Sequence, residues 1–175
     1  IIINAQTIGN IIDNWKMTLE MEQTDETPMT DQVDCNALCQ EVARDVVIRQ
    51  PETVELRLES TVSHLTVTTN KAYLKKILSE LLHNANKYTL EGFITIGCEQ
   101  KADGSVRFYV ADSGPGIPEA DRERIFTQFT KLNDFNEGLG MGLCLCRQLA
   151  QRLGGTLEQD PLYLGGTRML LTLPA

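Results

Sequence analysis

The stretch that decides the fold is Glu-Leu-Leu-His-Asn-Ala-Asn-Lys-Tyr, residues 80–88. It lies in a longer segment whose apolar residues recur with a period of about 3.6, which predicts one helix from Asn70 to near Gly92. At roughly 100° per residue, Glu80, Asn84 and Lys87 lie along one polar edge of this helix. Tyr88 lies on the ridge beside that edge. Such an edge is typical of a solvated helix face, so it indicates a site only if other segments meet it.

Two glycine-rich segments are candidates to meet that edge. Residues 112–117, Asp-Ser-Gly-Pro-Gly-Ile, follow a predicted strand that ends at Val110. This segment fits a plain tight turn, but glycines beside a carboxylate also let the backbone approach a planar ligand, and an ionised aspartate accepts from an exocyclic amine. Residues 138–143, Gly-Leu-Gly-Met-Gly-Leu, open a second predicted helix, where backbone N–H groups favour an anion. Their spacing matches neither a Walker P-loop nor Gly-x-Gly-x-x-Gly.

The rest of the chain alternates between helical and strand-like patterns. Asp34 is suited to cap a helix that ends before Pro51. The other predicted elements are half-buried strands at 54–58 and 65–67 with a turn around 60–63, strands at 93–99 and 106–110 with a turn at 102–104, a helix at 142–153, and strands at 156–159 and 167–173. Hairpin-linked strands that alternate irregularly with helices predict an α+β fold, a two-layer sandwich, and not a parallel βαβ array.

The N-terminal segment repeats apolar residues at alternating spacings of four and three, which is a heptad seam. The seam consists of Ile1, Ala5, Ile8, Ile12, Trp15 and Leu19. Two interpretations fit: a helix packed on its own domain, or one helix of an oligomeric bundle, which the narrowness of the stripe favours. The polar stretch 23–32, with Pro28, is predicted to be a linker. We therefore divide the chain into a helix at 1–22, a linker at 23–34 and a globular domain at 35–175.

Composition and charge exclude several classes of protein. A net charge of −8 and a pI near 4.8 oppose binding to a nucleic-acid backbone. Five cysteines without a secretory signal, and without zinc-like spacing, favour free thiols in a reducing cytoplasm. No stretch approaches the roughly 18 consecutive apolar residues of a membrane helix. Because a helical pattern is already running at Ile1, we expect the chain to be a fragment of a longer protein.

Five segments, in this order, resemble the motif boxes of the GHKL ATPases. Residues 80–88 resemble the N box, 112–117 the G1 box, 126–129 (Phe-Thr-Gln-Phe) the F box, 138–143 the G2 box, and 166–167 (Gly-Thr) the G3 box. The resemblance covers about residues 53–174, and the F box points to sensor histidine kinases. It implies a Bergerat ATP-binding fold, in which a mixed sheet packs against helices, preceded here by a short N-terminal helix.

The resemblance also implies a site for ATP and magnesium between the N-box helix and a lid at about 130–139. The residues implied to contact the nucleotide are Asn84, Lys87, Tyr88, Asp112, Gly114, Gly116, Ile117, Lys131, Gly138, Gly140, Gly142, Leu143 and Thr167. Asp112 is expected to accept from the adenine amine, and Thr167 to support that contact through water. Asn84 and Glu80 are the implied magnesium and catalytic residues, because magnesium prefers hard oxygen ligands. Phe126 and Phe129 are expected to pack the lid and not to contact the ligand.

Two departures from the family pattern bear on activity. Glu80 stands where the N box commonly has asparagine, and in gyrase-like and Hsp90-like relatives a glutamate here activates water. In a kinase it is expected to bind the water shell of magnesium or to orient the nucleophile. The phosphoacceptor motif, a histidine followed by an acidic residue and a later proline, is absent, because His64 is predicted in a strand and His83 on another helix face. We expect the chain to bind ATP without accepting its phosphoryl group.

The resemblance as a whole implies the ATP-binding catalytic domain of a two-component sensor histidine kinase. Such a domain transfers the γ-phosphoryl group to a histidine on a dimerisation and phosphotransfer domain, for relay to an aspartate of a response regulator receiver domain. Residues 1–22 then resemble the end of the second dimerisation helix, which implies a homodimer in the full-length protein and a cytoplasmic location in a membrane-anchored sensor. Two alternatives stay open: an ATP hydrolase that uses Glu80 as base, and a degenerate domain that serves only as an interaction module.

Overall fold

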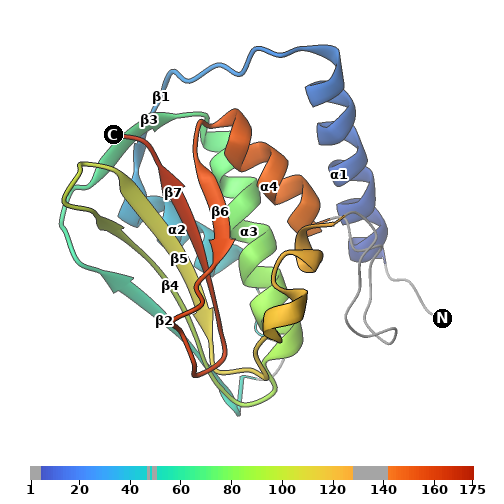
Figure 1. Ribbon diagram of the computed structural model, residues 1–175, viewed down its shortest axis with the longest axis vertical. Coiled ribbons are helices and arrows are strands. Elements are labelled where there is room, and N and C mark those ends of the chain that lie inside the picture. Colours follow the sequence, from blue (N-terminus) through green and yellow to red (C-terminus); the bar gives the residue numbers. More distant parts are fainter. Residues whose placement is uncertain (1–4, 47, 49–50, 128–141) are drawn as a thin grey trace.

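The computed structural model describes residues 5–46, 48, 51–127 and 142–175, which form two layers (Figure 1). One layer is a five-stranded sheet in the order β2-β4-β5-β7-β6. Its strands are β2 (Val54–Ser60), β4 (Gly92–Gln100), β5 (Val106–Asp112), β7 (Thr167–Leu173) and β6 (Thr156–Gln159). β2 is parallel to β4, whereas the other neighbouring strands are antiparallel. The expected α+β sandwich with a mixed sheet is confirmed.

Helices form the second layer, on one face of the sheet (Figure 1). They are α2 (Cys35–Asp45), α3 (Lys71–Tyr88) and α4 (Gly142–Arg152), and α1 (Ala5–Gln23) packs outside α4. Two of them begin at the residues that the sequence indicated. Asp34 Oδ1 accepts from the Ala37 N–H at 2.9 Å to cap α2, and Asn70 Oδ1 accepts from the Tyr73 N–H at 3.1 Å to cap α3. Two short 3₁₀ turns, Glu119–Asp121 and Arg124–Phe126, precede α4.

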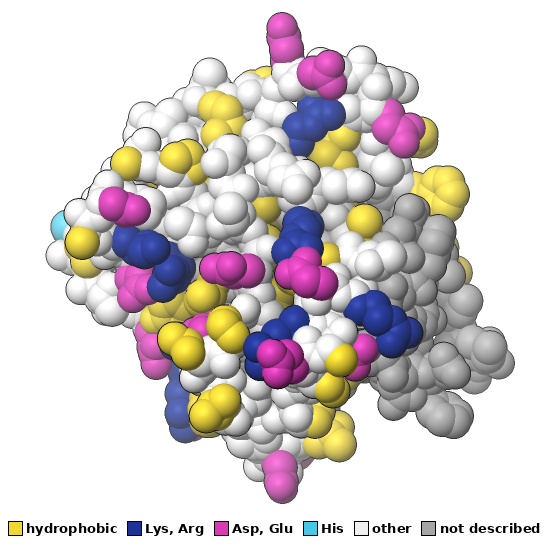
Figure 2. Space-filling view, viewed as in Figure 1, with side chains coloured by type: hydrophobic (Ala, Val, Ile, Leu, Met, Phe, Trp, Pro, Cys, Tyr) yellow, Lys and Arg dark blue, Asp and Glu magenta, His cyan; other side chains and the backbone are white. Residues whose placement is uncertain are grey.

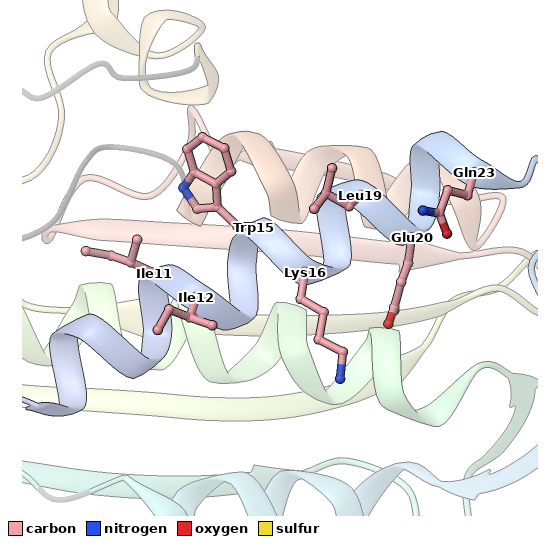
Figure 3. Close-up of a pocket in the computed structure, with 7 residues that line it drawn as sticks. All are labelled: Ile11, Ile12, Trp15, Lys16, Leu19, Glu20 and Gln23. Carbon is pink, nitrogen blue, oxygen red and sulfur yellow. The ribbon is translucent and has the colours of Figure 1, made fainter.

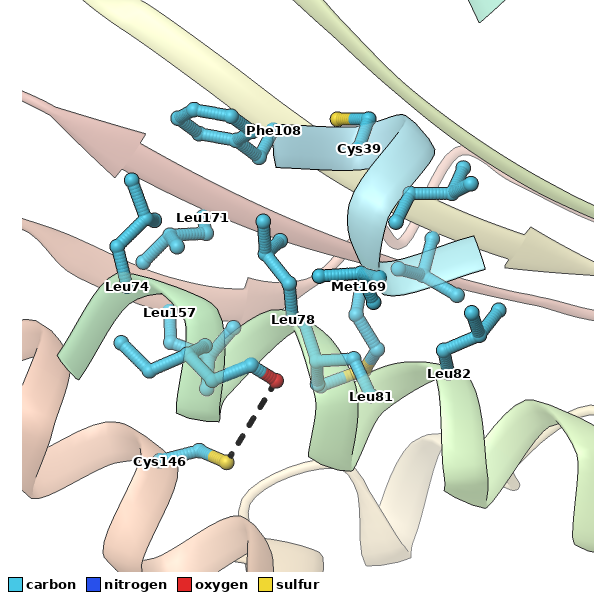
Figure 4. Packing of buried hydrophobic residues seen from close by; sticks show 14 of the residues in the cluster. Cys39, Leu74, Leu78, Leu81, Leu82, Phe108, Cys146, Leu157, Met169 and Leu171 are labelled. Atoms are coloured by element: carbon cyan, nitrogen blue, oxygen red, sulfur yellow. Dashed lines mark hydrogen bonds between the residues drawn. The ribbon is translucent and has the colours of Figure 1, made fainter. Parts of the chain in front are cut away.

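The core lies between the helices and the sheet (Figure 4). Leu74 and Leu78 of α3 are fully buried, as are Phe108 of β5 and Leu171 of β7. Each such side chain contributes about 1.5–3 kcal/mol when it leaves water. Cys146 of α4 is buried beside α3, where burial raises the pKa of its thiol well above the ordinary value. All five cysteines are free thiols.

The pairing of the strands differs from the prediction in one region. A turn lies between β2 and β3 (Thr66–Thr69), as expected, but these strands do not form a hairpin, because β3 pairs with β1 (Asp31–Asp34) in a separate two-stranded sheet. β1 therefore occupies the end of the predicted linker. His64 lies in a turn with φ of 61°, not in a strand, and this left-handed residue redirects the chain between the two sheets.

The boundaries of two further elements also differ from the prediction. The long helix α3 ends at Tyr88, before the predicted end near Gly92, because Thr89 adopts an extended conformation with φ of −94° and ψ of 111°. The strand predicted to end at Val110 continues as β5 to Asp112. α3 thus ends at Tyr88 and β5 at Asp112, and both residues belong to the predicted site.

The heptad seam of α1 does not pack on the described part of the domain. Ile8, Ile12, Trp15 and Leu19 are 47%, 59%, 51% and 51% exposed, whereas Met21 is buried. The exposed face forms a shallow groove (Figure 3) lined by Ile11, Ile12, Trp15, Lys16, Leu19, Glu20 and Gln23. α1 therefore packs on its own domain through another face, which includes Met17 and Met21, and the seam takes no part in that packing. The bundle interpretation remains a prediction.

An arginine of α4 connects the end of α1 to the domain through hydrogen bonds. The Arg152 guanidinium, at the end of α4, donates to the Thr24 carbonyl oxygen at 2.6 Å and to the Met21 carbonyl oxygen. On the face seen in Figure 2, basic and acidic side chains lie next to one another, so no continuous basic surface forms among the described residues there. None of the described helices has both the length and the apolar character needed to span a membrane.

Candidate functional site

Asp112 is the buried carboxylate at the centre of the candidate site. It is the last residue of β5, pairs with Thr167 of β7 and is 7% exposed. Its Oδ1 accepts from the Gly114 N–H at 2.9 Å and from the Thr167 N–H at 3.3 Å. Within the described part of the chain, Oδ2 is thus the oxygen that remains for a ligand. Burial raises the pKa of Asp112, and the two backbone donors partly oppose this rise.

Glycines allow the backbone around Asp112 to pack closely. Gly166 has φ of 149°, and a Cβ there would lie 2.0 Å from the Asp112 carbonyl oxygen. Gly116 has φ of 76°, and a Cβ there would lie 3.2 Å from the Gly166 carbonyl oxygen. A side chain at either position would separate the segments 112–117 and 166–167. The structure therefore brings together the two segments predicted to bind the base.

Glu80 of α3 lies against the first residue of α4. A Cβ at Gly142 would lie 2.7 Å from Glu80 Oε2, and the other carboxylate oxygen, Oε1, forms an ion pair with Lys76 Nζ at 2.8 Å. The side chains of Lys76 and Glu80 are only 15% and 13% exposed. A carboxylate at a helix N-terminus is electrostatically favourable, because the free N–H groups of the first turn carry partial positive charge. The N-box helix and the start of the G2 helix thus meet at Glu80.

Helix α3 connects the two ends of the site. At its C-terminal end, a Cβ at Gly114 would lie 3.3 Å from the Tyr88 carbonyl oxygen, so the segment after β5 contacts the end of α3. Glu80 lies eight residues earlier, which corresponds to about 12 Å along the helix axis. That span is comparable with the distance from a purine base to the end of a triphosphate chain.

The remaining predicted residues fall into three groups. Asn84 and Lys87 are partly buried on the same helix, and Lys87 Nζ lies 5.5 Å from the centroid of the Tyr88 ring, which is 37% exposed. Ile117 and Leu143 are partly buried and pack against the core. Outside the described residues lie Lys131, Gly138, Gly140, Phe129 and the predicted lid at 130–139.

The first phenylalanine of the F box is a packing residue. Phe126 is buried, and the Arg147 guanidinium lies 4.0 Å from its ring centroid. Arg147 Nη1 also pairs with Glu123 Oε2 at 2.8 Å. This cluster attaches the residues after the G1 box to the middle of α4. Phe126 is therefore buried in the core, and its expected packing against the lid stays a prediction, because that segment lies outside the described residues.

Sequence reasoning missed two residues of the site. Lys76 pairs with Glu80 across one helical turn, and this i, i+4 spacing of opposite charges was a signal that could have found it. Thr89 follows the last residue of α3, and its buried hydroxyl lies near Gly114. No local pattern indicates Thr89, because its place depends on how β5 approaches α3.

The oxygen atoms of the N-box edge fit a magnesium site completed by phosphate and water. Within the described residues, no group of three or more His, Cys, Asp or Glu side chains could hold a metal by itself. Magnesium is commonly bound through only one or two protein carboxylates plus substrate phosphates, so a complete protein cage is not required. Glu80 and the Asn84 amide are hard oxygen donors on one edge of α3 and are suitable for this role.

Comparisons with known proteins agree with this geometry. Residues 69–175 match the family described as "Histidine kinase-, DNA gyrase B-, and HSP90-like ATPase". The chain belongs to this ATPase family. The adaptive-response sensory kinase SasA of Thermosynechococcus vestitus is 32% identical over 178 residues, which cover 97% of the chain and 46% of SasA. The chain thus spans less than half of this relative.

Solved structures indicate which members of this family the chain resembles, namely the histidine kinases. Full-length ShkA in complex with AMPPNP has a TM-score of 0.77 and 27% identity, over 86% of the chain and 32% of ShkA. The nucleotide-free catalytic domain of histidine kinase ThkA has a TM-score of 0.71 and 29% identity, over 82% of the chain and 94% of that domain. The chain therefore contains an ATP-binding catalytic domain of the sensor histidine kinase type.

Proposed function

We propose that this chain binds ATP with magnesium and transfers the γ-phosphoryl group to a histidine of a dimerisation and phosphotransfer domain. A response regulator receiver domain would then take the phosphoryl group on an aspartate. The observation that carries the proposal is the arrangement along α3, with buried Asp112 near one end and the contact of Glu80 with Gly142 two turns away. This arrangement separates a base-binding end from a phosphate-binding end on one rigid element.

At the base-binding end, Asp112 accepts from the exocyclic amine of adenine. Its Oδ1 is already held by two backbone N–H groups, so the carboxylate presents Oδ2 in a fixed orientation. Gly114 and Gly116 let the base approach the backbone, and Ile117 and Tyr88 offer apolar surface to its faces. Thr167 supports the contact, because its N–H holds the carboxylate from β7. An acceptor of this kind distinguishes adenine from a base with a carbonyl at the same position.

At the phosphate-binding end, the first turn of α4 presents backbone N–H groups from Gly142 and Leu143. These groups, together with Lys87, favour the negative charge of a triphosphate. Bound magnesium would offset much of the remaining phosphate charge, with Asn84 and Glu80 as its protein-side oxygen donors. Lys76 keeps the Glu80 carboxylate in place through their ion pair. We propose the same phosphate contacts for Lys131, Gly138 and Gly140, which lie outside the described residues.

The chain's own residues would contribute to phosphoryl transfer by positioning and by charge stabilisation. The transfer needs an acceptor in line with the leaving oxygen, and neither histidine of the chain belongs to the set of residues that forms the site. His64 lies in the turn before β3, and His83 lies on α3 about 60° from Glu80 around the helix axis, but neither is followed by the acidic residue of a phosphoacceptor motif. The acceptor histidine must therefore come from another domain.

The exposed seam of α1 supports a dimeric full-length protein. Four large apolar residues, Ile8, Ile12, Trp15 and Leu19, are each about half exposed on one helix. Large exposed apolar stripes are typical of protein–protein contacts. We propose that α1 is the C-terminal part of a dimerisation helix, joined to the catalytic domain by a linker. A cytoplasmic location, as expected from the free cysteines, belongs to the same proposal.

Nucleotide binding is tested by calorimetry with Mg-ATP on the 175-residue chain. The wild type is expected to bind, and Asn84→Ala is expected to weaken binding, because one oxygen donor to magnesium is lost. Ser79→Ala on the same helix is the matched control, since Ser79 lies outside the predicted edge. Absence of binding by the wild type would reject the proposal and favour the interaction-module alternative.

Transfer is tested by adding a separate domain that carries the phosphoacceptor histidine, together with radiolabelled Mg-ATP. The kinase proposal expects label on that domain and none on the chain itself. The hydrolase alternative expects rapid release of phosphate by the chain alone, abolished by Glu80→Gln. Rapid, Glu80-dependent release without any acceptor would place the chain with the gyrase-like hydrolases.

A further inference from the structure

Three buried cysteines lie together where α2 packs on the sheet. Cys35 and Cys39 belong to α2 and Cys98 belongs to β4, and their residues are 0%, 2% and 1% exposed. Cys35 and Cys39 are one helical turn apart, so they lie on the same face of α2. Within the described residues, these thiols do not form a group that could hold a metal. Their chemistry is therefore considered as that of free thiols.

Two of the three thiols, those of Cys39 and Cys98, are in contact. Cys98 Sγ lies 3.1 Å from Asn36 Oδ1, and Asn36 and Cys39 are three residues apart and thus neighbours on α2. The Cys39 thiol also donates a hydrogen bond to the Cys98 sulfur. The Cys35 thiol instead donates to the Val33 carbonyl oxygen at 3.9 Å, in the direction of β1. Cys39 and Cys98 therefore form a dithiol pair between a helix and a strand.

Their hydrogen bond makes the two thiols of this pair unequal. It raises the pKa of Cys39, which donates, and lowers the pKa of Cys98, because it stabilises the Cys98 thiolate. Burial raises the pKa of the Cys35 thiol to about 12. The thiolate is the form of cysteine that attacks an oxidant. Cys98 is therefore suited to react first, with Cys39 beside it to complete a disulfide.

One exposed turn covers Cys98. All residues of the turn at 60–64 are exposed, and hydrogen bonds to α2 and β4 attach the turn there. Asn36 Nδ2 donates to the Val62 carbonyl oxygen at 2.8 Å, and Thr61 Oγ1 donates to the Cys98 carbonyl oxygen at 3.4 Å. Exposed turns with few bonds open locally at low cost. Opening of this turn would bring solvent to Cys98 while the rest of the sheet stays paired.

We propose that Cys39 and Cys98 form a reversible disulfide when a peroxide enters through the opened turn. The Cys98 thiolate attacks one oxygen of hydrogen peroxide, the O–O bond breaks, and hydroxide leaves and takes up a proton to become water. Cys98 is then a sulfenic acid. The Cys39 sulfur attacks the Cys98 sulfur, the S–S bond forms and the S–O bond breaks, and the hydroxyl leaves with the Cys39 proton as a second water. Two thiols are oxidised, and one peroxide is reduced to two waters.

The disulfide would join α2 to β4 covalently. In the reduced chain, Glu41 of α2 pairs with Lys71 and Lys75 of α3 at 3.5 Å and 3.0 Å, so ion pairs tie this helix to its neighbour. A disulfide restricts the unfolded chain, and this one would close a loop of about 60 residues. Disulfides in a reducing compartment are typically transient and redox-sensing. Neither thiol belongs to the candidate nucleotide site, so the disulfide is independent of the proposed function.

The test treats the folded 175-residue chain with hydrogen peroxide, blocks the remaining thiols and locates disulfides by peptide mass spectrometry. We expect a cross-link between the peptides of Cys39 and Cys98, which dithiothreitol separates again. The oxidised chain is expected to unfold about 5–15 °C above the reduced chain. Cys144→Ala is the matched control, because this partly exposed cysteine lies on α4 and its loss should leave the cross-link unchanged.

Two further variants test the order of reaction and the route. In Cys39→Ala, the Cys98 sulfenic acid has no thiol beside it, so dimedone is expected to trap it; Cys39→Ser serves if the alanine variant does not fold. Asn36→Ala removes the hydrogen bond to the Val62 carbonyl oxygen that attaches the turn. It is expected to speed cross-linking about fivefold, the effect of one ordinary hydrogen bond on the opening equilibrium.

Four results would overturn the proposal. The first is a disulfide that joins other cysteines, and the second is oxidation confined to Cys144 while Cys39 and Cys98 stay reduced. The third is a link between Cys39 and Cys98 that forms only after the chain is unfolded in denaturant. Equal rates of cross-linking in the wild type and Asn36→Ala would be the fourth, because the turn would then not be the route of the oxidant.

Discussion

Gly142, the first residue of α4, lies directly against the carboxylate of Glu80, and a Cβ at Gly142 would lie 2.7 Å from Glu80 Oε2. Terminal atoms of a flexible side chain usually move aside at little cost. Here the other oxygen of the carboxylate is held by Lys76 at 2.8 Å, and the side chain is largely buried. The contact with Glu80 is thus one structural reason for a glycine at this position.

We expect Gly142→Ala to destabilise the chain by about 1 kcal/mol, because the strain of overpacking exceeds the gain in helix propensity. In a Glu80→Ala background the same substitution is expected to cost nothing. Chemical denaturation of the wild type, the two single variants and the double variant measures this coupling directly. Gly9→Ala in α1 is the matched control, since a Cβ there meets nothing within 4 Å. An equal cost in both backgrounds would show that the Glu80 contact is not the cause.

Gly166→Ala is expected to destabilise the chain by at least about 2 kcal/mol and to abolish ATP binding. The added Cβ would overlap the Asp112 carbonyl oxygen at 2.0 Å, so β7 must move away from β5 at the base-binding end. Gly165→Ala, one residue earlier, is the control, because its closest neighbour lies at 3.9 Å. The unfolding temperature and the affinity for ATP should both be clearly lower for Gly166→Ala than for Gly165→Ala. Similar values for the two variants would contradict the close packing described above.

Asp112→Asn is expected to stabilise the nucleotide-free chain at neutral pH while weakening ATP binding tenfold or more, the effect of about 1.5–3 kcal/mol for one charged hydrogen bond. The two backbone donors both use Oδ1, and an asparagine Oδ1 can accept from them equally well. The substitution therefore removes the buried charge without breaking either bond.

The pH dependence of this difference follows from the sign of the pKa shift. Burial raises the pKa of Asp112 in the folded state. At pH values between the ordinary and the raised pKa, the folded chain therefore binds more protons than the unfolded chain. The contribution of this group to stability is complete below about 3.9, the ordinary aspartate pKa, and is lost as the pH rises through the raised value. The stability of Asp112→Asn relative to the wild type should therefore increase with pH and then level off. A difference that is constant between pH 3.5 and 7.5 would contradict this interpretation.

Arg152→Ala is expected to lower the local stability at the end of α1 by about 1–2 kcal/mol. The reason is that the carbonyl oxygens of Met21 and Thr24 both lose their hydrogen-bond donor. Hydrogen exchange should accelerate in the last turn of α1 and stay unchanged in β5. Arg152→Lys keeps the charge but cannot donate from a planar fork to both oxygens, so it should give an intermediate rate. Unchanged exchange in α1 would show that the arginine does not hold this helix.

Most helices and strands could be predicted because their apolar periodicity is local. α3 and β5 were predicted from residues within each element, Asp34 was correct as a cap, and the predicted start of the long helix at Asn70 coincides with its cap. The pairing of β2 was not predictable in this way, because its partner β4 lies beyond α3 in the sequence. β1 carries only one buried residue, Val33, and so gives no alternating pattern.

The candidate site, too, could be predicted only where its residues lie close together in the sequence. Asp112 and the glycines after it were predicted because they are adjacent in the sequence, and Glu80, Asn84 and Lys87 because they share a helix edge. The contact of Glu80 with Gly142, and the proximity of Thr89 to Gly114, join residues far apart in the chain. These contacts are set by how α3 packs against α4 and β5, which local spacing does not encode.

The order of the sheet has a consequence for how this chain avoids aggregation. β2 is an edge strand, and an unpaired edge is a template for strand addition by a second molecule. Three charged side chains, Glu55, Arg57 and Glu59, alternate along this short strand, and Glu55 and Arg57 pair at 3.0 Å. In-register pairing with a second β2 would place like charges beside one another on the exposed face of the sheet. This edge of the sheet therefore opposes self-association, whereas the dimer contact that we propose lies on the apolar face of α1.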